Sequence, residues 1–136
     1  MSKIQRMEDE KLELIRKIKT EFEGEFNHLD ILSIAGVLAN AVEVEEVDSY
    51  LVGTLVLACI SVAGDEFKEE AIVEAFNLPK PEDMSAMDIK EALESELLYV
   101  IEGIEGFLSF ADMVAFLFEI NIFDALQEAY EKNSDE

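Results

Sequence analysis

Apolar residues along this chain recur at steps of three and four positions, the spacing that places side chains on one face of an α-helix. No stretch alternates between apolar and polar residues for long enough to indicate a β-strand. The apolar runs and the breaks between them predict helices over residues 2–22, 28–42, 49–64, 65–77, 85–102 and 109–132. We therefore expect an all-α fold, a single compact bundle of about six helices.

The segment Ser49–Gly64 differs from the other predicted helices because none of its sixteen residues is charged. Its apolar side chains show no preferred face, which is typical of a helix that is surrounded by protein. At about 1.5 Å per residue this helix would span roughly 24 Å, shorter than the roughly 30 Å core of a lipid bilayer. The sequence therefore predicts that residues 49–64 form the central helix and that the other helices pack around it.

Residue types that favour helix ends mark the boundaries of several of these helices. Asn27 and Asp30 have the spacing of a capping box at the start of the second helix. Asp48 or Ser49 can cap the start of the central helix, and Gly64 is suited to end it. The apolar positions of the first helix suit docking on the body, although Lys11 interrupts them.

A chain of 136 residues has the usual size of one domain, so we expect a single acidic helical domain over residues 1–136. Residues 1–22 would form an amphipathic N-terminal helix of mixed charge, residues 28–132 the helical body, and residues 133–136 a frayed tail. The first residues lack the apolar segment of a signal peptide. A single cysteine, Cys59, suits a reducing compartment, and we expect a cytoplasmic location.

The formal net charge is −22, and it is unevenly distributed along the chain. Six of the ten basic residues lie within the first nineteen positions, whereas His28 to Glu136 contains four basic and 25 acidic residues. Such a surface repels nucleic-acid phosphates and anionic lipids, and it attracts basic proteins or cations. We therefore expect a basic protein surface as the partner, with no direct binding to nucleic acid or to a membrane. Solubility alone would also explain this acidity.

Residues that commonly carry catalysis are scarce in this sequence. It contains one histidine and one cysteine, and Cys59 lies in the middle of the most apolar predicted helix. Glu25 and His28 form one Glu-x-x-His pair, whereas di-iron bundles use two such pairs and two further glutamates. The sequence also lacks an EF-hand loop, a P-loop and a glycine-rich dinucleotide fingerprint. We therefore expect neither an enzyme nor a bound cofactor.

The C-terminal third of the chain combines carboxylates with large apolar side chains. Ser109 has capping-box spacing to Asp112, which predicts one helix that continues to about Lys132. Five of the nine phenylalanines lie within residues 107–123 and cannot all face one side of that helix. Anionic anchors beside an apolar groove suit a basic amphipathic partner helix. The residues that we expect to bind the partner are Glu102, Glu105, Asp112, Phe116 and Glu119.

On a single helix Asp112 and Glu119, seven residues apart, would share one face. The alternative is that these carboxylates bind no partner and form the solvated stripe of an amphipathic helix. Apolar residues that the core does not use would also suit a homodimer, formed through the N-terminal helix or through the Phe-rich C-terminal helix.

Residues Leu57–Leu78, which read LACISVAGDEFKEEAIVEAFNL, are similar to the helix–acidic turn–helix unit of tellurite-resistance TerB-like domains. Those domains are all-helical and are linked to metal or stress responses. Their turn has the form Ala-x-x-Asp-Gly, whereas the turn Ala63–Glu66 of this chain has Gly before Asp. The cation ligands that this resemblance implies are Asp65, Glu66, Glu69 and Glu70.

The sequence thus leaves two functions open. The first is a non-enzymatic acidic protein-interaction module, such as an adaptor, an inhibitor, an immunity-type protein or a chaperone-like protein, that binds a basic protein. In one version of this function, surface carboxylates mimic the phosphates of a nucleic acid. The alternative is a TerB-like helical domain that binds a cation or a small ligand in a stress response.

Overall fold

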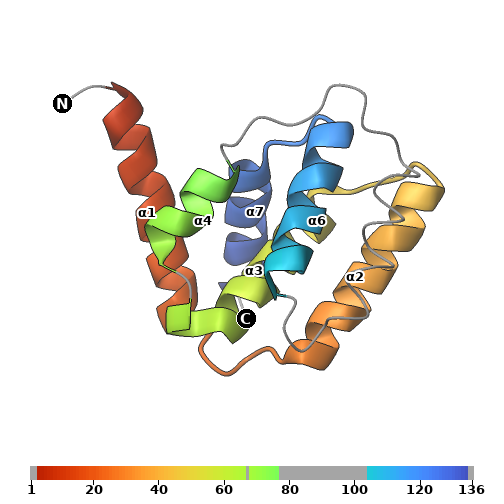
Figure 1. Cartoon of the computed structure of the whole chain (residues 1–136), viewed down its shortest axis with the longest axis horizontal. Coiled ribbons are helices and arrows are strands. Elements are labelled where there is room, and N and C mark those ends of the chain that lie inside the picture. The colour runs from red at the N-terminus through yellow and green to blue at the C-terminus, as the bar shows by residue number, and fades with distance from the viewer. Residues whose placement is uncertain (1–2, 67, 77–103, 135–136) are drawn as a thin grey trace.

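The computed structural model describes residues 3–66, 68–76 and 104–134, which form a bundle of α-helices without a β-strand (Figure 1). The all-α prediction is therefore confirmed, whereas the predicted helix over residues 85–102 lies outside the described residues. The helices are α1 (Lys3–Glu21), α2 (His28–Glu43), α3 (Ser49–Ala63), the short 3-10 helix η1 (Gly64–Glu66), α4 (Glu69–Phe76), α6 (Ile104–Leu117) and α7 (Ile122–Ser134).

Helix α3 is the centre of the bundle, as its uncharged sequence predicts. Helices α1, α2, α6 and α7 all pack against it. Every residue from Leu55 to Ser61 is buried, together with Val52 and Gly53. The hydroxyl of Ser61 donates a hydrogen bond to the main-chain carbonyl of Phe22 at the end of α1, so this buried polar group has a partner.

Helices α3 and α7 are also joined by polar contacts near the start of α3. The hydroxyl oxygen of Ser49 lies 3.0 Å from Oε2 of Glu128. Lys132 Nζ lies 3.1 Å from the other oxygen of that carboxylate and 4.5 Å from the centre of the Tyr50 ring. Because these contacts join residues of both helices, they help to fix the position of α7 along the axis of α3.

The predicted caps of α2 and α3 are confirmed. Oδ1 of Asn27 accepts a hydrogen bond from the main-chain N–H of Asp30 at 3.0 Å, and the Asp30 carboxylate accepts from the N–H of Asn27 at 2.9 Å. Asp48 Oδ1 accepts from the N–H of Tyr50 at 2.9 Å. Gly64 follows the last residue of α3 with a φ of 54°, a conformation that favours glycine.

The prediction of one last helix over residues 109–132 is wrong. Helix α6 already begins at Ile104, so Ser109 and Asp112 lie inside it and do not cap it. The segments Gly106–Leu117 and Ile122–Ser134 are bent by 113° relative to each other. Similarly, η1 occupies the start of the predicted helix over residues 65–77, and α4 begins only at Glu69.

Asn121 explains why a new helix begins after α6. Its Oδ1 accepts hydrogen bonds from the main-chain N–H groups of Phe123 and Asp124, at 3.0 and 3.1 Å. This is the arrangement of an N-cap, which satisfies N–H groups that the first turn of a helix leaves without a partner.

Helix α1 docks on the body through its C-terminal half, whereas its first turns extend beyond the neighbouring helices (Figure 1). Tyr130 Oη of α7 donates a hydrogen bond to Glu21 Oε2 at 2.7 Å. The Tyr130 ring also lies edge-on to Phe22, with 6.0 Å between the ring centres. The residues of this segment that are buried against the body are Leu14, Ile15, Ile18 and Phe22.

Candidate protein-binding site

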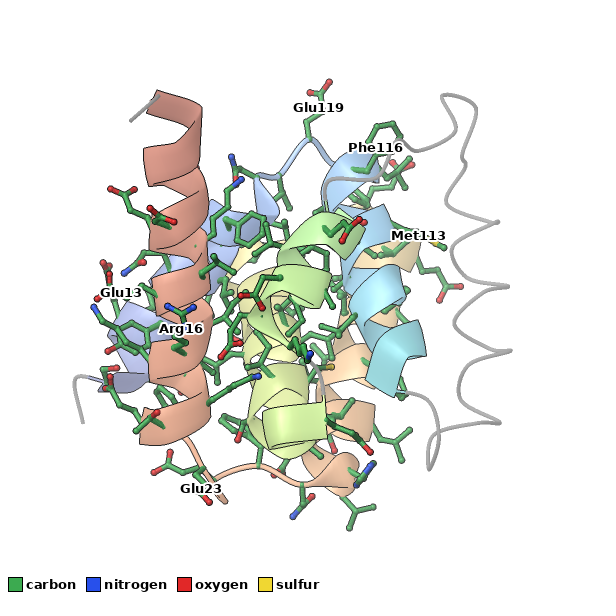
Figure 2. The ribbon with its side chains drawn as sticks, turned by 60° about the vertical axis from the view of Figure 1, so that its left-hand side comes forward. Glu13, Arg16, Glu23, Met113, Phe116 and Glu119 are labelled. Carbon is green, nitrogen blue, oxygen red and sulfur yellow. The ribbon has the colours of Figure 1, made fainter. Side chains whose placement is uncertain are left out.

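Three of the predicted partner-binding residues come from α6 and from the turn that follows it. Asp112 and Phe116 lie one helical turn apart on α6, and Glu119 lies in the turn between α6 and α7 (Figure 2). The expectation that Asp112 and Glu119 share one helix face is therefore wrong, because α6 ends before Glu119. All of Glu102 and the side chain of Glu105 lie outside the described residues, so the site is built from the other three.

Asp112 and Phe116 line a pocket of about 250 Å³ to which α1, α4, α6 and α7 contribute. This volume is below the roughly 300–1,000 Å³ of most small-molecule sites, so the pocket suits a side chain of a partner better than a cofactor. The apolar lining residues are Phe76, Ala115, Phe116, Ile120, Ile122 and Phe123, and the polar ones are Lys11, Asp112 and Asn121.

One wall of this pocket is held by contacts around the ring of Phe123. Lys11 Nζ of α1 lies 4.6 Å from the centre of this ring, a cation–π contact. The Phe76 ring of α4 packs edge-on against Phe123, with ring centres 5.6 Å apart and an angle of 71° between the planes. Since three helices meet at Phe123, this wall is already formed before any partner arrives.

Two exposed side chains lie at this end of the bundle, an aromatic ring that lines the pocket and a carboxylate in the adjacent turn. Phe116 is 41% exposed, although it is a large apolar residue. Glu119 is exposed and points away from the body at the top of the α6–α7 turn (Figure 2). Its φ of 56° closes this turn, in which the N–H of Ile120 donates to the Ala115 carbonyl at 2.8 Å. The arrangement can therefore offer apolar and anionic contacts side by side.

Sequence reasoning missed the contributions of Lys11, Phe76 and Asn121 to this pocket. Lys11 did leave a signal, because it interrupts an otherwise apolar stripe, and Asn121 has a carboxylate three residues later, as Asn27 has. Phe76 left none, because an apolar residue on an amphipathic helix is indistinguishable from an ordinary core residue.

The carboxylates implied by the TerB-like resemblance have other surroundings. Glu69 Oε1 lies 3.8 Å from Arg16 Nε and 3.7 Å from Lys19 Nζ, so this carboxylate joins α4 to α1. Glu66 and Glu70 are exposed, and the side chain of Asp65 is not among those described. Within residues 3–66, 68–76 and 104–134, no group of three or more His, Cys, Asp or Glu side chains could hold a metal ion.

The single cysteine and the single histidine of the chain differ in their exposure to solvent. Cys59 is fully buried in α3, and burial raises the pKa of its thiol well above the ordinary value. The thiol therefore stays protonated at neutral pH, which is the unreactive form. His28 is the exposed first residue of α2, and Glu25 is exposed in the preceding turn.

No single helix in the described part of the chain is both long and apolar enough to cross a membrane. The segments Gly106–Leu117 and Ile122–Ser134 reach that length and composition only as a pair, across their 113° bend.

Comparisons of the chain with protein-family models, with curated proteins and with solved structures find no match.

Proposed function

We propose that this protein is a non-enzymatic interaction module that binds a basic protein through the α6–α7 turn. It would serve as an adaptor, an inhibitor, an immunity-type protein or a chaperone-like protein. The observation that carries this proposal is the half-exposed ring of Phe116 at a preformed pocket with both apolar and polar lining residues, beside the exposed carboxylate of Glu119 in the adjacent turn. Aromatic residues at the rim of a pocket are frequent anchors of protein interfaces.

In this proposal, the two kinds of contact have different roles. An apolar side chain of the partner enters the pocket and packs on Phe116, which supplies most of the affinity. Glu119 pairs with a lysine or arginine of the partner, and the net charge of −22 speeds the encounter by long-range attraction. Salt should therefore slow association more than it accelerates dissociation.

The TerB-like alternative has no comparable observation in its favour. Its candidate ligand Glu69 is already paired with Arg16 and Lys19. Mimicry of nucleic acid is a narrower form of the proposed function, and it predicts that duplex DNA competes with this protein for its partner.

A synthetic amphipathic helical peptide of lysine, leucine and alanine is a direct probe of this site. Titration calorimetry at low and raised salt would measure its affinity for the protein and for variants. We expect Phe116→Ala to weaken binding about tenfold, which corresponds to about 1.4 kcal/mol. Glu119→Gln should weaken binding less and should reduce its dependence on salt.

Two matched variants control for general effects of charge and exposed apolar area. Leu29→Ala removes an exposed apolar side chain from α2, and Glu131→Gln removes an exposed carboxylate from α7. Leu29→Ala should change peptide affinity less than Phe116→Ala does, and Glu131→Gln should change it less than Glu119→Gln does. Equal losses in all four variants would show that the peptide binds the acidic surface without a defined site, and the proposal would then fail.

A further inference from the structure

Helix α2 presents an uncharged stripe to solvent at the edge of the bundle opposite α1 (Figure 1). Among the described residues, four large apolar side chains are exposed, and two of them belong to α2: Leu29 at 72% and Val37 at 55%. A third, Val44 at 63%, is the C-cap residue that directly follows this helix. The remaining exposed positions on the same face, which complete the α2 stripe, are Ser33, Gly36 and Asn40.

The stripe is unusual because the rest of this protein is so acidic. No residue from Ile31 to Val42 is charged, and the opposite face of α2 is already buried against the core. A helix that is uncharged on both faces is typical of a position between two layers of protein. Exposed apolar side chains that are aligned along one uncharged helix face suit contact with another protein surface.

We propose that the α2 stripe is a self-association surface, on which α2 of a second copy packs antiparallel about a two-fold axis. The residues of the stripe are arranged symmetrically about the point between Gly36 and Val37. In an antiparallel pair centred there, Leu29 lies opposite the partner's Val44, Ser33 opposite the partner's Asn40, and Gly36 opposite the partner's Val37. The same three pairs occur a second time by symmetry, as a two-fold interface requires.

Each of these pairs is chemically matched. Apolar side chains meet at both ends of the stripe, and the hydroxyl of Ser33 lies opposite an amide that can exchange a hydrogen bond with it. At the centre, a Cβ atom added at Gly36 would have no neighbour within 4 Å, so the partner's Val37 has space to approach the helix backbone closely. This self-matching order identifies the occupant as a second copy of the chain.

Charge at the edges of the stripe determines how this association responds to salt. Asp30 and Glu43 flank the stripe, and Glu45 and Glu46 are exposed just beyond it. Two copies therefore bring like charges together, and salt should strengthen the dimer by screening them. One helix per partner also offers less than the roughly 800 Å² of a standard interface, so we expect a weak dimer.

Sedimentation equilibrium over a range of protein concentrations, at low and raised salt, tests the surface. We expect a monomer–dimer equilibrium that shifts toward dimer with salt, and a dissociation constant at least tenfold weaker in Val37→Glu. Phe116→Glu, which changes an exposed apolar residue on α6, is the matched control and should dimerise as the unchanged protein does. A protein that stays monomeric up to about 1 mM would overturn the proposal.

The Phe116→Glu variant also distinguishes between two dimer interfaces, one on the α2 stripe and one on the Phe-rich surface of α6. If Phe116→Glu abolishes association and Val37→Glu does not, the interface lies on the Phe-rich surface and the α2 proposal is wrong. Thermal melting of both variants would verify that they fold. Since Val37 and Phe116 are both exposed, we expect their melting temperatures to stay close to that of the unchanged protein.

A cross-linking experiment tests the antiparallel register. With Ser33→Cys and Asn40→Cys in one chain, mild oxidation should give a disulfide-linked dimer, because each new thiol faces the other position of the partner. Within one chain, the two positions are separated by about 10 Å along the helix, too far for a disulfide. Native Cys59 is buried and does not compete.

The two single variants make this test specific. Neither should cross-link alone, whereas an equal mixture of the two should. Efficient linkage of Ser33→Cys to itself would mean a different register. Absence of linkage in the double variant under conditions where it sediments as a dimer would place the interface elsewhere.

Discussion

Gly53 of α3 lies directly against the main chain of Ala125 in α7. A Cβ atom at Gly53 would overlap the carbonyl group of Ala125 and would come within 3.0 Å of the main-chain nitrogen of Leu126. The two helices therefore approach so closely that only a residue without a side chain fits between them. This contact makes a glycine necessary in the middle of a helix, where glycine would otherwise be unfavourable.

The first prediction is that Gly53→Ala destabilises the protein by about 1–3 kcal/mol, because α7 must move away from α3. Gly36→Ala is the matched control, since Gly36 is also within a helix but has no neighbour at its Cβ position. That variant should be more stable by about 0.5–1 kcal/mol, measured at concentrations where the protein is monomeric. Urea unfolding measures both effects, and equal stabilities of the two variants would contradict the close approach.

The second prediction concerns the cap of α7. Asn121→Ala removes the oxygen that accepts hydrogen bonds from Phe123 and Asp124, and it should cost about 0.5–2 kcal/mol of unfolding free energy. Asn121→Asp keeps an acceptor at the same place and should remain within about 0.5 kcal/mol of the unchanged protein. If both substitutions are equally costly, the side chain acts through packing in the pocket and not as a cap.

The third prediction concerns the left-handed backbone at Glu119. Its φ of 56° is unfavourable for a residue with a side chain, and Glu45 after α2 has a similar φ of 58°. Replacement of either residue by glycine should raise the unfolding free energy by up to about 1 kcal/mol, as thermal melting would show. Only Glu119→Gly should weaken binding of the basic peptide. If both glycine variants are less stable than the unchanged protein, the positive φ at these two positions does not cost the native fold free energy.

The fourth prediction concerns the thiol of Cys59. Because burial raises its pKa, an aromatic disulfide reagent should modify it far more slowly in the native protein than in urea. Rapid labelling of the native protein would show that α3 is accessible, against the burial described above.

The same raised pKa makes stability depend on alkaline pH. Below about pH 8.5, the thiol is protonated in both the folded and the unfolded state, so it contributes its full stabilising effect. As pH rises further, the unfolded thiol ionises while the folded thiol does not, and the free energy of unfolding falls. Denaturant titrations between about pH 8 and 10 should show this decrease, and Cys59→Ala should lack that part of it.

Much of the fold follows from local features of the sequence. The absence of charge from Ser49 to Gly64 places α3 in the centre, because a charged residue there would be buried without a partner. The caps at Asn27 and Asp48 are also local, since each side chain binds a main-chain group two or three residues ahead. Such features are readable without knowledge of the rest of the structure.

The sequence also contains a signal for the division between α6 and α7, although the apolar pattern predicts one continuous helix there. Asn121 and Asp124 have the same spacing as Asn27 and Asp30, but the continuous apolar residues around them suggested one long helix. By contrast, the need for glycine at position 53 depends on how α3 and α7 align. The pocket at Phe116 likewise depends on segments that are distant in sequence, and local patterns carry no information about such alignments.

The position of α3 within the sequence has a consequence for how the protein is made. Helix α3 ends at Ala63, whereas α6 and α7, which cover two of its sides, begin at Ile104 and Ile122. During translation, this apolar helix therefore leaves the ribosome well before α6 and α7 exist. The nascent chain must keep this segment from aggregating in the meantime, so we expect it to be a substrate for general chaperones until α7 has been synthesised.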